Sequence, residues 1–194
     1  MSKYAKPIIV GFIVAFVVSG GLGFMAAAGG ADPGMTPAIV GMIFGVFTAY
    51  IMANLAGNRK GKAASHEDKA AAVALRPEPG KALLIVFRDG FVGKAAGMNV
   101  GVDGRIVTQL KSPRFAAIPL EVGRHEMELA FGGLAAEQNR ANVEQFGVGA
   151  GEVVAYKARI SMGALKNTIH VERVTPDAAL SAKLRSMTMT ALET

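Results

Sequence analysis

The sequence contains no cysteine, and its first 57 residues carry almost no charge. The missing cysteines exclude disulfides, thiolate metal ligands, cysteine nucleophiles and a lipid anchor on cysteine. The three histidines, His66, His125 and His170, do not pair at a spacing that places two metal ligands on one helix face. We therefore expect no metal, no cofactor and no catalytic residues, and we interpret the protein as a non-enzyme.

Two long apolar segments, 7–28 and 37–57, occupy the uncharged region. Each has about 20 residues and rises about 1.5 Å per residue, which is enough to cross a hydrocarbon core of about 30 Å. Neither segment contains a charged side chain, so an ion or proton path within them is not expected. The sequence predicts a transmembrane helical hairpin over residues 1–57, in contact with the lipid bilayer.

Small side chains recur at every fourth position of both segments, on one face of each helix. Such a face lets two helix backbones approach closely in lipid. The two faces either meet each other within the hairpin, or at least one of them docks on another membrane protein subunit or a second copy of the chain. The predicted helix-packing residues are Gly11, Ala15, Ser19, Gly23, Gly41, Gly45, Ala49 and Ala53.

The distribution of basic residues predicts the orientation of the hairpin. Lys3 and Lys6 precede the first segment, and Arg59, Lys60 and Lys62 follow the second, whereas the connection between them holds only Asp32. Basic residues near membrane spans stay preferentially in the cytoplasm. We expect a multi-pass protein of the bacterial inner membrane with both termini and the soluble domain in the cytoplasm. A cleaved signal peptide ending near 26–28 is the alternative for the first segment.

Residues 58–80 are interpreted as a basic, Ala- and Pro-containing linker, with a short helix from a Ser65 cap to Leu75. Its basic cluster, Arg59, Lys60 and Lys62, is a candidate membrane-surface site for anionic headgroups, although the same cluster is also the topology signal.

From residue 81 the apolar pattern changes to the period of two that is typical of strands. Leu83–Phe87 is continuously apolar, which indicates a strand covered on both faces. Asp103-Gly104 lies between two apolar runs and predicts a hairpin turn. The further expected strands are 98–102, 106–110, 115–120, 125–131, 143–148, 152–161 and 167–174. They predict an all-β antiparallel sandwich over residues 81–175.

An amphipathic helix is expected over the C-terminal residues 176–194. Thr175 and Pro176 supply a helix start, and Leu180, Leu184 and Met187 begin an apolar stripe at helical spacing. The expected fold class is thus a membrane α-helical hairpin followed by a β-sandwich with a C-terminal helix.

Several motifs in the predicted sandwich occur together in a known pattern: Leu84-Ile85-Val86-Phe87-Arg88, Phe91-Val92-Gly93, Val100-Gly101-Val102-Asp103-Gly104-Arg105, Leu110, Pro119 and Gly123-Arg124-His125. The pattern resembles a family of small bacterial β-sandwich domains of unknown function, frequent on lipoproteins, that share the VDG hairpin and G-x-H turn with PEGA-type domains. Val122 stands where that family often has proline. The resemblance covers roughly residues 81–175 and implies a binding or scaffolding domain.

Charged and polar residues of the sandwich are interpreted mainly as structural. We expect Asp103 to be a turn residue and His125 to have a structural or exposed role. Gly147–Gly151 lacks the Lys-Ser/Thr of a phosphate-binding loop. A basic surface at the long loops is one interpretation of four residues, but we expect them to be ordinary solvated charge: Arg88, Lys94, Arg114 and Arg140. Because basic and acidic residues are interspersed, nucleic-acid binding is not expected.

These observations favour an accessory or scaffolding subunit of a larger membrane protein complex. The alternative is a membrane-tethered binding module for a small ligand, lipid headgroup or glycan.

Overall fold

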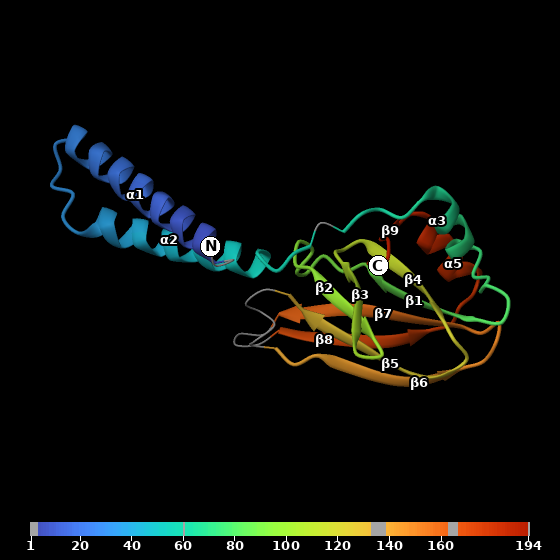
Figure 1. The fold of residues 1–194 in the computed structure, drawn as a ribbon. Coiled ribbons are helices and arrows are strands. Elements are labelled where there is room, and N and C mark those ends of the chain that lie inside the picture. The colour runs from blue at the N-terminus through green and yellow to red at the C-terminus, as the bar shows by residue number, and fades with distance from the viewer. Residues whose placement is uncertain (1–3, 60, 133–138, 163–166, 194) are drawn as a thin grey trace. The chain divides into compact units, whose positions relative to one another are not determined.

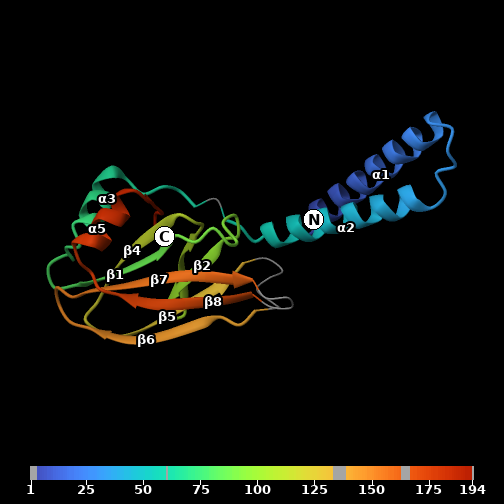
Figure 2. The same ribbon diagram turned by 180° about the vertical axis from the view of Figure 1, so that it is seen from behind.

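The computed structural model describes residues 4–59, 61–132, 139–162 and 167–193. The chain divides into two compact units, Met1–Gly57 and Asn58–Thr194. Figure 1 and Figure 2 show the elements of each unit from opposite sides.

The first unit is a pair of packed helices, α1 (Ala5–Ala28) and α2 (Thr36–Leu55). Their most apolar windows have mean hydropathies of 2.4 and 1.9, and both helices are long and apolar enough to cross a membrane. Large apolar side chains point outward, with Phe16 81% exposed and Phe24 76% exposed. In the turn between the helices, the Asp32 carboxylate accepts a hydrogen bond from the Gly34 N–H at 3.0 Å. An apolar outer surface of this kind is typical of helices that face lipid.

The second unit is a β-sandwich, as the alternating pattern predicts. One sheet has the strand order β8-β7-β1-β4-β9 and the other has the order β3-β2-β5-β6. The first sheet comprises β1 (Ala82–Arg88), β4 (Arg114–Leu120), β7 (Val153–Met162), β8 (Asn167–Val174) and β9 (Thr188–Met189). The second comprises β2 (Met98–Val102), β3 (Arg105–Leu110), β5 (Gly123–Phe131) and β6 (Asn142–Val148).

The pairing of the strands is mixed in the first sheet, which corrects the purely antiparallel expectation. β1 pairs antiparallel with β4 but parallel with β7, and β4 pairs parallel with β9. Parallel neighbours need a long crossover. For β1 and β7 that crossover consists of β2 and β3 in the second sheet, β4 in the first sheet, and β5 and β6 in the second sheet. Period-two patterning does not distinguish parallel from antiparallel partners, so the sequence pattern did not indicate this pairing.

The central strand β1 has cores on both of its faces, as its continuous apolar run predicts. Leu84 and Val86 lie in the core between the two sheets. Ile85 and Phe87 lie in a second core on the outer face of the sheet. That outer face is covered by α3 (His66–Val73) and α5 (Ala178–Arg185) (Figure 1).

The C-terminal helix is much shorter than the expected 176–194. Asp177, rather than Thr175, caps α5, because its carboxylate accepts from the Leu180 N–H at 2.9 Å. After Arg185 the chain extends, since Met187 and Met189 bury their side chains in the outer core. The Thr190 N–H then bonds to the Phe115 carbonyl at 2.8 Å. The short strand β9 therefore follows α5 at the edge of the first sheet.

Residues 58–80 pack on the sandwich and are not a free linker. Ser65 caps α3 as expected, accepting from the Asp68 N–H at 3.0 Å. Ala63 forms an antiparallel bridge with Thr190. This segment therefore completes the edge of the first sheet and covers its outer face.

Candidate functional site

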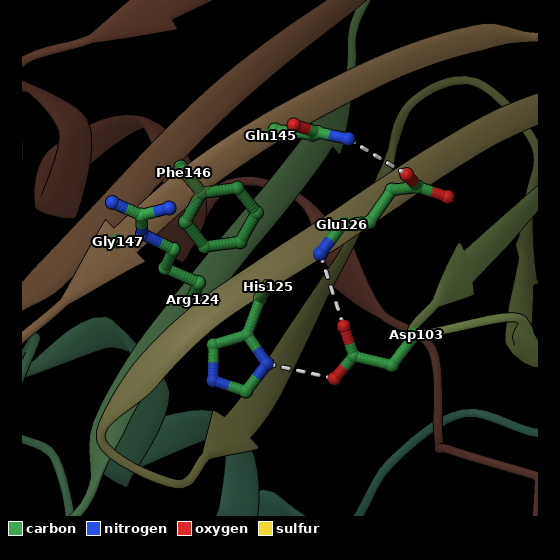
Figure 3. A pocket seen from close by; sticks show the side chains of 7 residues that line it. All are labelled: Asp103, Arg124, His125, Glu126, Gln145, Phe146 and Gly147. Atoms are coloured by element: carbon green, nitrogen blue, oxygen red, sulfur yellow. Dashed lines mark hydrogen bonds and ion pairs between the residues drawn. The ribbon is translucent and has the colours of Figure 1, made fainter.

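The predicted Asp103-Gly104 turn is present and positions a carboxylate against β5. Both residues have positive φ, 51° and 75°, as a two-residue hairpin turn requires. The Asp103 carboxylate accepts from the Glu126 N–H at 3.0 Å and contacts His125 Nδ1 at 2.7 Å (Figure 3). These bonds fasten the β2–β3 hairpin to the neighbouring strand.

His125 is held by two acceptors, which favours its protonated form. Nδ1 faces the Asp103 carboxylate, and Nε2 faces the Glu121 carbonyl at 2.8 Å. Because both partners accept, both ring nitrogens donate, and a neutral imidazole has only one N–H. Partial burial lowers the pKa of His125, but these hydrogen bonds outweigh it and leave the pKa above its ordinary value. The hydrogen bond from the Glu126 backbone, followed by that from His125, lowers the pKa of Asp103.

The same residues line an open pocket of about 490 Å³, together with Arg124, Gln145 and Phe146. The Phe146 ring lies 6.1 Å from the His125 ring and separates the histidine from the core. Both ring nitrogens of His125 are already engaged, and none of the described lining residues offers a hydroxyl or thiol nucleophile. The geometry agrees with the structural roles expected for Asp103 and His125, and it leaves a pocket of mixed charge.

Arg88 is buried, whereas the sequence analysis predicted a solvent-exposed side chain. The residue is 1% exposed. Its guanidinium donates to four backbone carbonyls, those of Val92, Gly93, Ala96 and Leu110, at 3.3, 2.6, 2.6 and 3.4 Å. Burial lowers the pKa of Arg88 to about 10. The signal available in the sequence was its place at the end of an otherwise apolar strand, directly before a long loop.

The two small-residue faces of the hairpin contact each other. A Cβ on Gly45 would lie 2.6 Å from the Gly11 carbonyl oxygen and 2.7 Å from Ala15 Cβ. A Cβ on Gly11 would lie 2.7 Å from Ala49 Cβ. The backbones therefore approach as closely as glycine permits.

The remaining predicted packing residues divide into two groups. A Cβ on Gly41 would overlap Ser19 Oγ, so these two residues also belong to the crossing, and Ala53 is buried at 7% exposure. Gly23 has nothing within 4 Å of a Cβ built on it. Of the predicted set, Gly23 is thus not brought to the crossing.

An apolar groove of about 570 Å³ runs along the crossing of α1 and α2. Small residues line it, among them Ala15, Ala38 and Gly45, together with large ones such as Phe12 and Met42. The groove belongs to the hairpin alone and is open to the surroundings of that unit.

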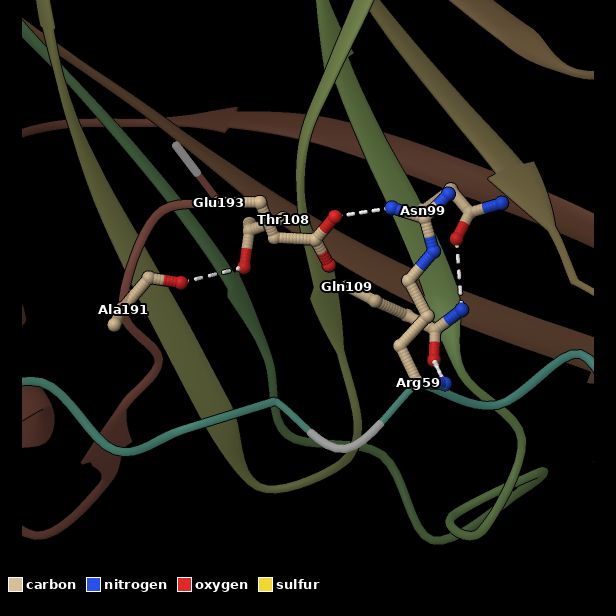
Figure 4. Close-up of polar contacts among 6 residues, drawn as sticks. All are labelled: Arg59, Asn99, Thr108, Gln109, Ala191 and Glu193. Atoms are coloured by element: carbon tan, nitrogen blue, oxygen red, sulfur yellow. Dashed lines mark hydrogen bonds and ion pairs between the residues drawn. The ribbon is translucent and has the colours of Figure 1, made fainter.

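Two of the three predicted membrane-surface residues are described by the structure, and their surroundings differ. The Arg59 side chain pairs with the Glu193 carboxylate. The Arg59 backbone N–H donates to Gln109 Oε1 at 2.7 Å (Figure 4). Lys62 is exposed, and Lys60 lies outside the described residues. Arg59 is therefore partly engaged in holding the entry of the chain into the sandwich.

A polar cluster holds that entry in place, and no sequence pattern predicts it. Gln109 Nε2 donates to Asn99 Oδ1 at 2.7 Å, and Thr108 Oγ1 donates to the Ala191 carbonyl at 3.0 Å (Figure 4). The Asn58 side chain bonds to the Ala95 carbonyl at 2.8 Å and accepts from the Gly97 N–H at 2.7 Å. The first residues of the second unit are thereby bound to β2, β3 and the loop between β1 and β2.

Within the described residues, no group of histidine and acidic side chains is arranged to hold a metal ion. Ser161 Oγ lies 2.9 Å from His170 Nε2, but this cross-strand pair is exposed, and none of the described carboxylates bonds to the other ring nitrogen. The pair lacks the orienting group that nucleophilic catalysis uses.

The chain matches no protein-family model and no curated protein. The β-sandwich implied by the VDG and G-x-H motifs is present, while membership of the lipoprotein-type or PEGA-type family stays a prediction.

Proposed function

We propose that this protein is a non-enzymatic accessory or scaffolding subunit of a membrane protein complex in the bacterial inner membrane. The hairpin crosses the bilayer twice, and both termini and the sandwich face the cytoplasm. The single observation that carries the subunit proposal is the apolar groove along the crossing of α1 and α2.

The membrane part of the proposal is supported by the outer surface of the hairpin. Both helices are uncharged in their interiors, and their large side chains are exposed, as with Phe12 at 71% and Phe47 at 61%. Basic residues before α1 and after α2, with Asp32 alone between them, support the cytoplasmic orientation.

The groove supports a helix of another subunit as the hairpin's partner. Ala38 is a small residue of the groove that does not belong to the contacts between α1 and α2 described above, and it is exposed. A small side chain there lets another helix backbone approach closely, which is how helices associate in lipid. Phe12 and Met42 line the same groove and would supply the packing contacts.

The test is co-purification from the membranes in which the protein is made, using a C-terminal tag and a mild detergent. The variant Ala38→Phe places an aromatic ring in the groove, and the control Ala27→Phe makes the same change at an exposed position outside it. The proposal expects stoichiometric partner subunits with the native chain and Ala27→Phe, and their loss with Ala38→Phe. A lone monomer from the native chain would overturn it.

The second candidate, a membrane-tethered binding module for a small ligand, lipid headgroup or glycan, is favoured by the pocket at His125. Arg124 and the His125 ring, whose two nitrogens are both hydrogen-bonded, offer positive charge there. The carboxylates of Asp103 and Glu126 lie beside them. Thermal-shift screening of the full chain against such ligands, with Arg124→Ala as the comparison, tests it. A ligand that stabilises the native chain and not Arg124→Ala would favour this function over the subunit.

A further inference from the structure

The loop between β1 and β2, Asp89–Gly97, presents an apolar tip to solvent. We name this segment the Phe91 loop. Phe91 is 86% exposed and Val92 is 40% exposed. The other described phenylalanines of the sandwich unit, Phe87, Phe115, Phe131 and Phe146, are all buried at 8% exposure or less. Phe91 and Val92 are neighbours in the sequence, so the tip of the loop exposes two adjacent apolar side chains.

The exposure of Phe91 does not come from a loose loop. Three of the four carbonyls bound by the buried Arg88 belong to the loop, at Val92, Gly93 and Ala96. Within the loop, the Lys94 N–H bonds to the Phe91 carbonyl at 3.1 Å. These hydrogen bonds hold the loop backbone in place with the Phe91 ring exposed. Little conformational entropy is then lost from the loop backbone when the tip binds.

The base of this loop is bound to Asn58, the first residue of the second unit. The Asn58 side chain donates to the Ala95 carbonyl and accepts from the Gly97 N–H. The loop is therefore held at its base as well as through Arg88.

The basic charge of the loop suits an anionic surface. Lys94 lies in the loop and is exposed, and basic residues are attracted to anionic headgroups. The one acidic residue of the loop, Asp89, is occupied by the ammonium groups of Lys157 and Lys183. Its charge is thus compensated within the fold.

From these observations we infer that the Phe91 loop inserts its apolar tip into the headgroup region of an anionic bilayer and holds the sandwich against the membrane surface. An aromatic side chain flanked by lysine is the side-chain combination that membrane interfaces favour. The inference rests on the proposed membrane anchoring and adds a second, peripheral contact to it.

The test uses the absence of tryptophan from the chain. In full-length Phe91→Trp the new indole is the sole tryptophan, and Val122→Trp is its control. Val122 is 54% exposed and follows β4 at the end of the sandwich opposite the Arg88–Arg114 pair. Both variants are reconstituted into phosphatidylcholine vesicles whose acyl chains carry bromine, a fluorescence quencher, with and without phosphatidylglycerol.

Flotation of the vesicles after an alkaline wash first shows whether the chain is embedded. The inference expects embedded Phe91→Trp to be quenched at least about twofold more than Val122→Trp, and more so with phosphatidylglycerol. Equal, weak quenching in an embedded chain overturns the loop contact and leaves the anchoring intact. A blue-shifted but unquenched Phe91→Trp overturns it as well, because the tip is then covered by protein. A chain washed off the vesicles overturns the anchoring and the loop contact together.

Discussion

Arg88 shows how much one buried side chain organises in the sandwich. Its guanidinium donates to four backbone carbonyls, and none of the carboxylates in the described part of the chain pairs with it. Removing one partner of a buried hydrogen bond costs more than the bond contributes, because the other partner is left without water. The cost is greater here because several acceptors lose their donor at once.

We therefore expect Arg88→Met to lower the free energy of unfolding of the sandwich by about 3 kcal/mol. Arg159→Met is the matched control, because Arg159 is exposed and its nearest carboxylate oxygen is 3.9 Å away. It should change stability by less than about 0.5 kcal/mol. Denaturant unfolding of both variants in detergent measures the difference, and equal stabilities would show that Arg88 is not a structural anchor.

The His125–Asp103 pair predicts a pH dependence with a defined sign. The raised pKa of His125 gives a contribution that is full below the ordinary imidazole pKa and is lost as pH rises through the raised value. The lowered pKa of Asp103 gives a contribution that is present above the ordinary carboxyl pKa and is lost as pH falls through the lowered value. The pair is therefore most stabilising between the ordinary carboxyl pKa and the ordinary imidazole pKa. Its contribution to the free energy of unfolding is no more than about 1 kcal/mol, because the Asp103 side chain is half exposed.

Asp103→Asn should lower the pKa of His125, since it replaces a carboxylate acceptor by a neutral amide. Glu128→Gln, an exposed change on the same strand, should leave the His125 titration as it is. Titration of the imidazole by NMR measures both. An unchanged His125 pKa in Asp103→Asn would contradict the ion-paired geometry.

Single residues were predictable from the sequence where their role depends on neighbouring residues in the chain. They were not predictable where the role depends on residues that are distant in the sequence. The Asp103-Gly104 turn follows from the backbone freedom of two adjacent residues. The burial of Arg88 depends on carbonyls supplied by a loop and by β3, and charge alone predicted exposure instead.

Among the elements, the helix crossing in the first unit makes the sharpest prediction. Gly45→Ala places a methyl group against the backbone of Gly11 and the side chain of Ala15, so the helices must separate. Gly23→Ala adds the same group where nothing lies within 4 Å. We expect Gly45→Ala to destabilise the hairpin by about 1–3 kcal/mol and Gly23→Ala to be neutral.

Spin labels on α1 and α2, with distances measured in bilayers, provide the readout. An unaltered interhelical distance in Gly45→Ala would contradict the close crossing.

The strands of the sandwich were largely predictable, because a half-buried strand alternates its side chains. β2 and β8 have the expected bounds, and most of the others differ by one or two residues. β9 was missed because it has two residues, too few for any period. The C-terminal helix was predicted too long, since Met187 continues the helical spacing of Leu180 and Leu184 while the backbone is already leaving the helix.

For the whole molecule, the separation into an apolar hairpin and a sandwich follows from composition, because the first 57 residues are nearly uncharged. The way the second unit begins did not follow from composition. Residues 58–80 resemble a linker in sequence, but Asn58 and Ala63 bond to distant parts of the sandwich. The described part of this segment therefore belongs to the folded second unit.

The most direct test of the account is the labelling of single cysteines in cells, which the cysteine-free chain permits without background. Ala31→Cys lies in the turn between α1 and α2, and Ala150→Cys lies in the turn between β6 and β7, both exposed. The account predicts that a membrane-impermeant maleimide labels Ala31→Cys in intact bacteria and labels Ala150→Cys only after the inner membrane is permeabilised. Labelling of Ala150→Cys in intact cells, or protection of Ala31→Cys, would contradict a hairpin that crosses the membrane twice and carries a cytoplasmic sandwich.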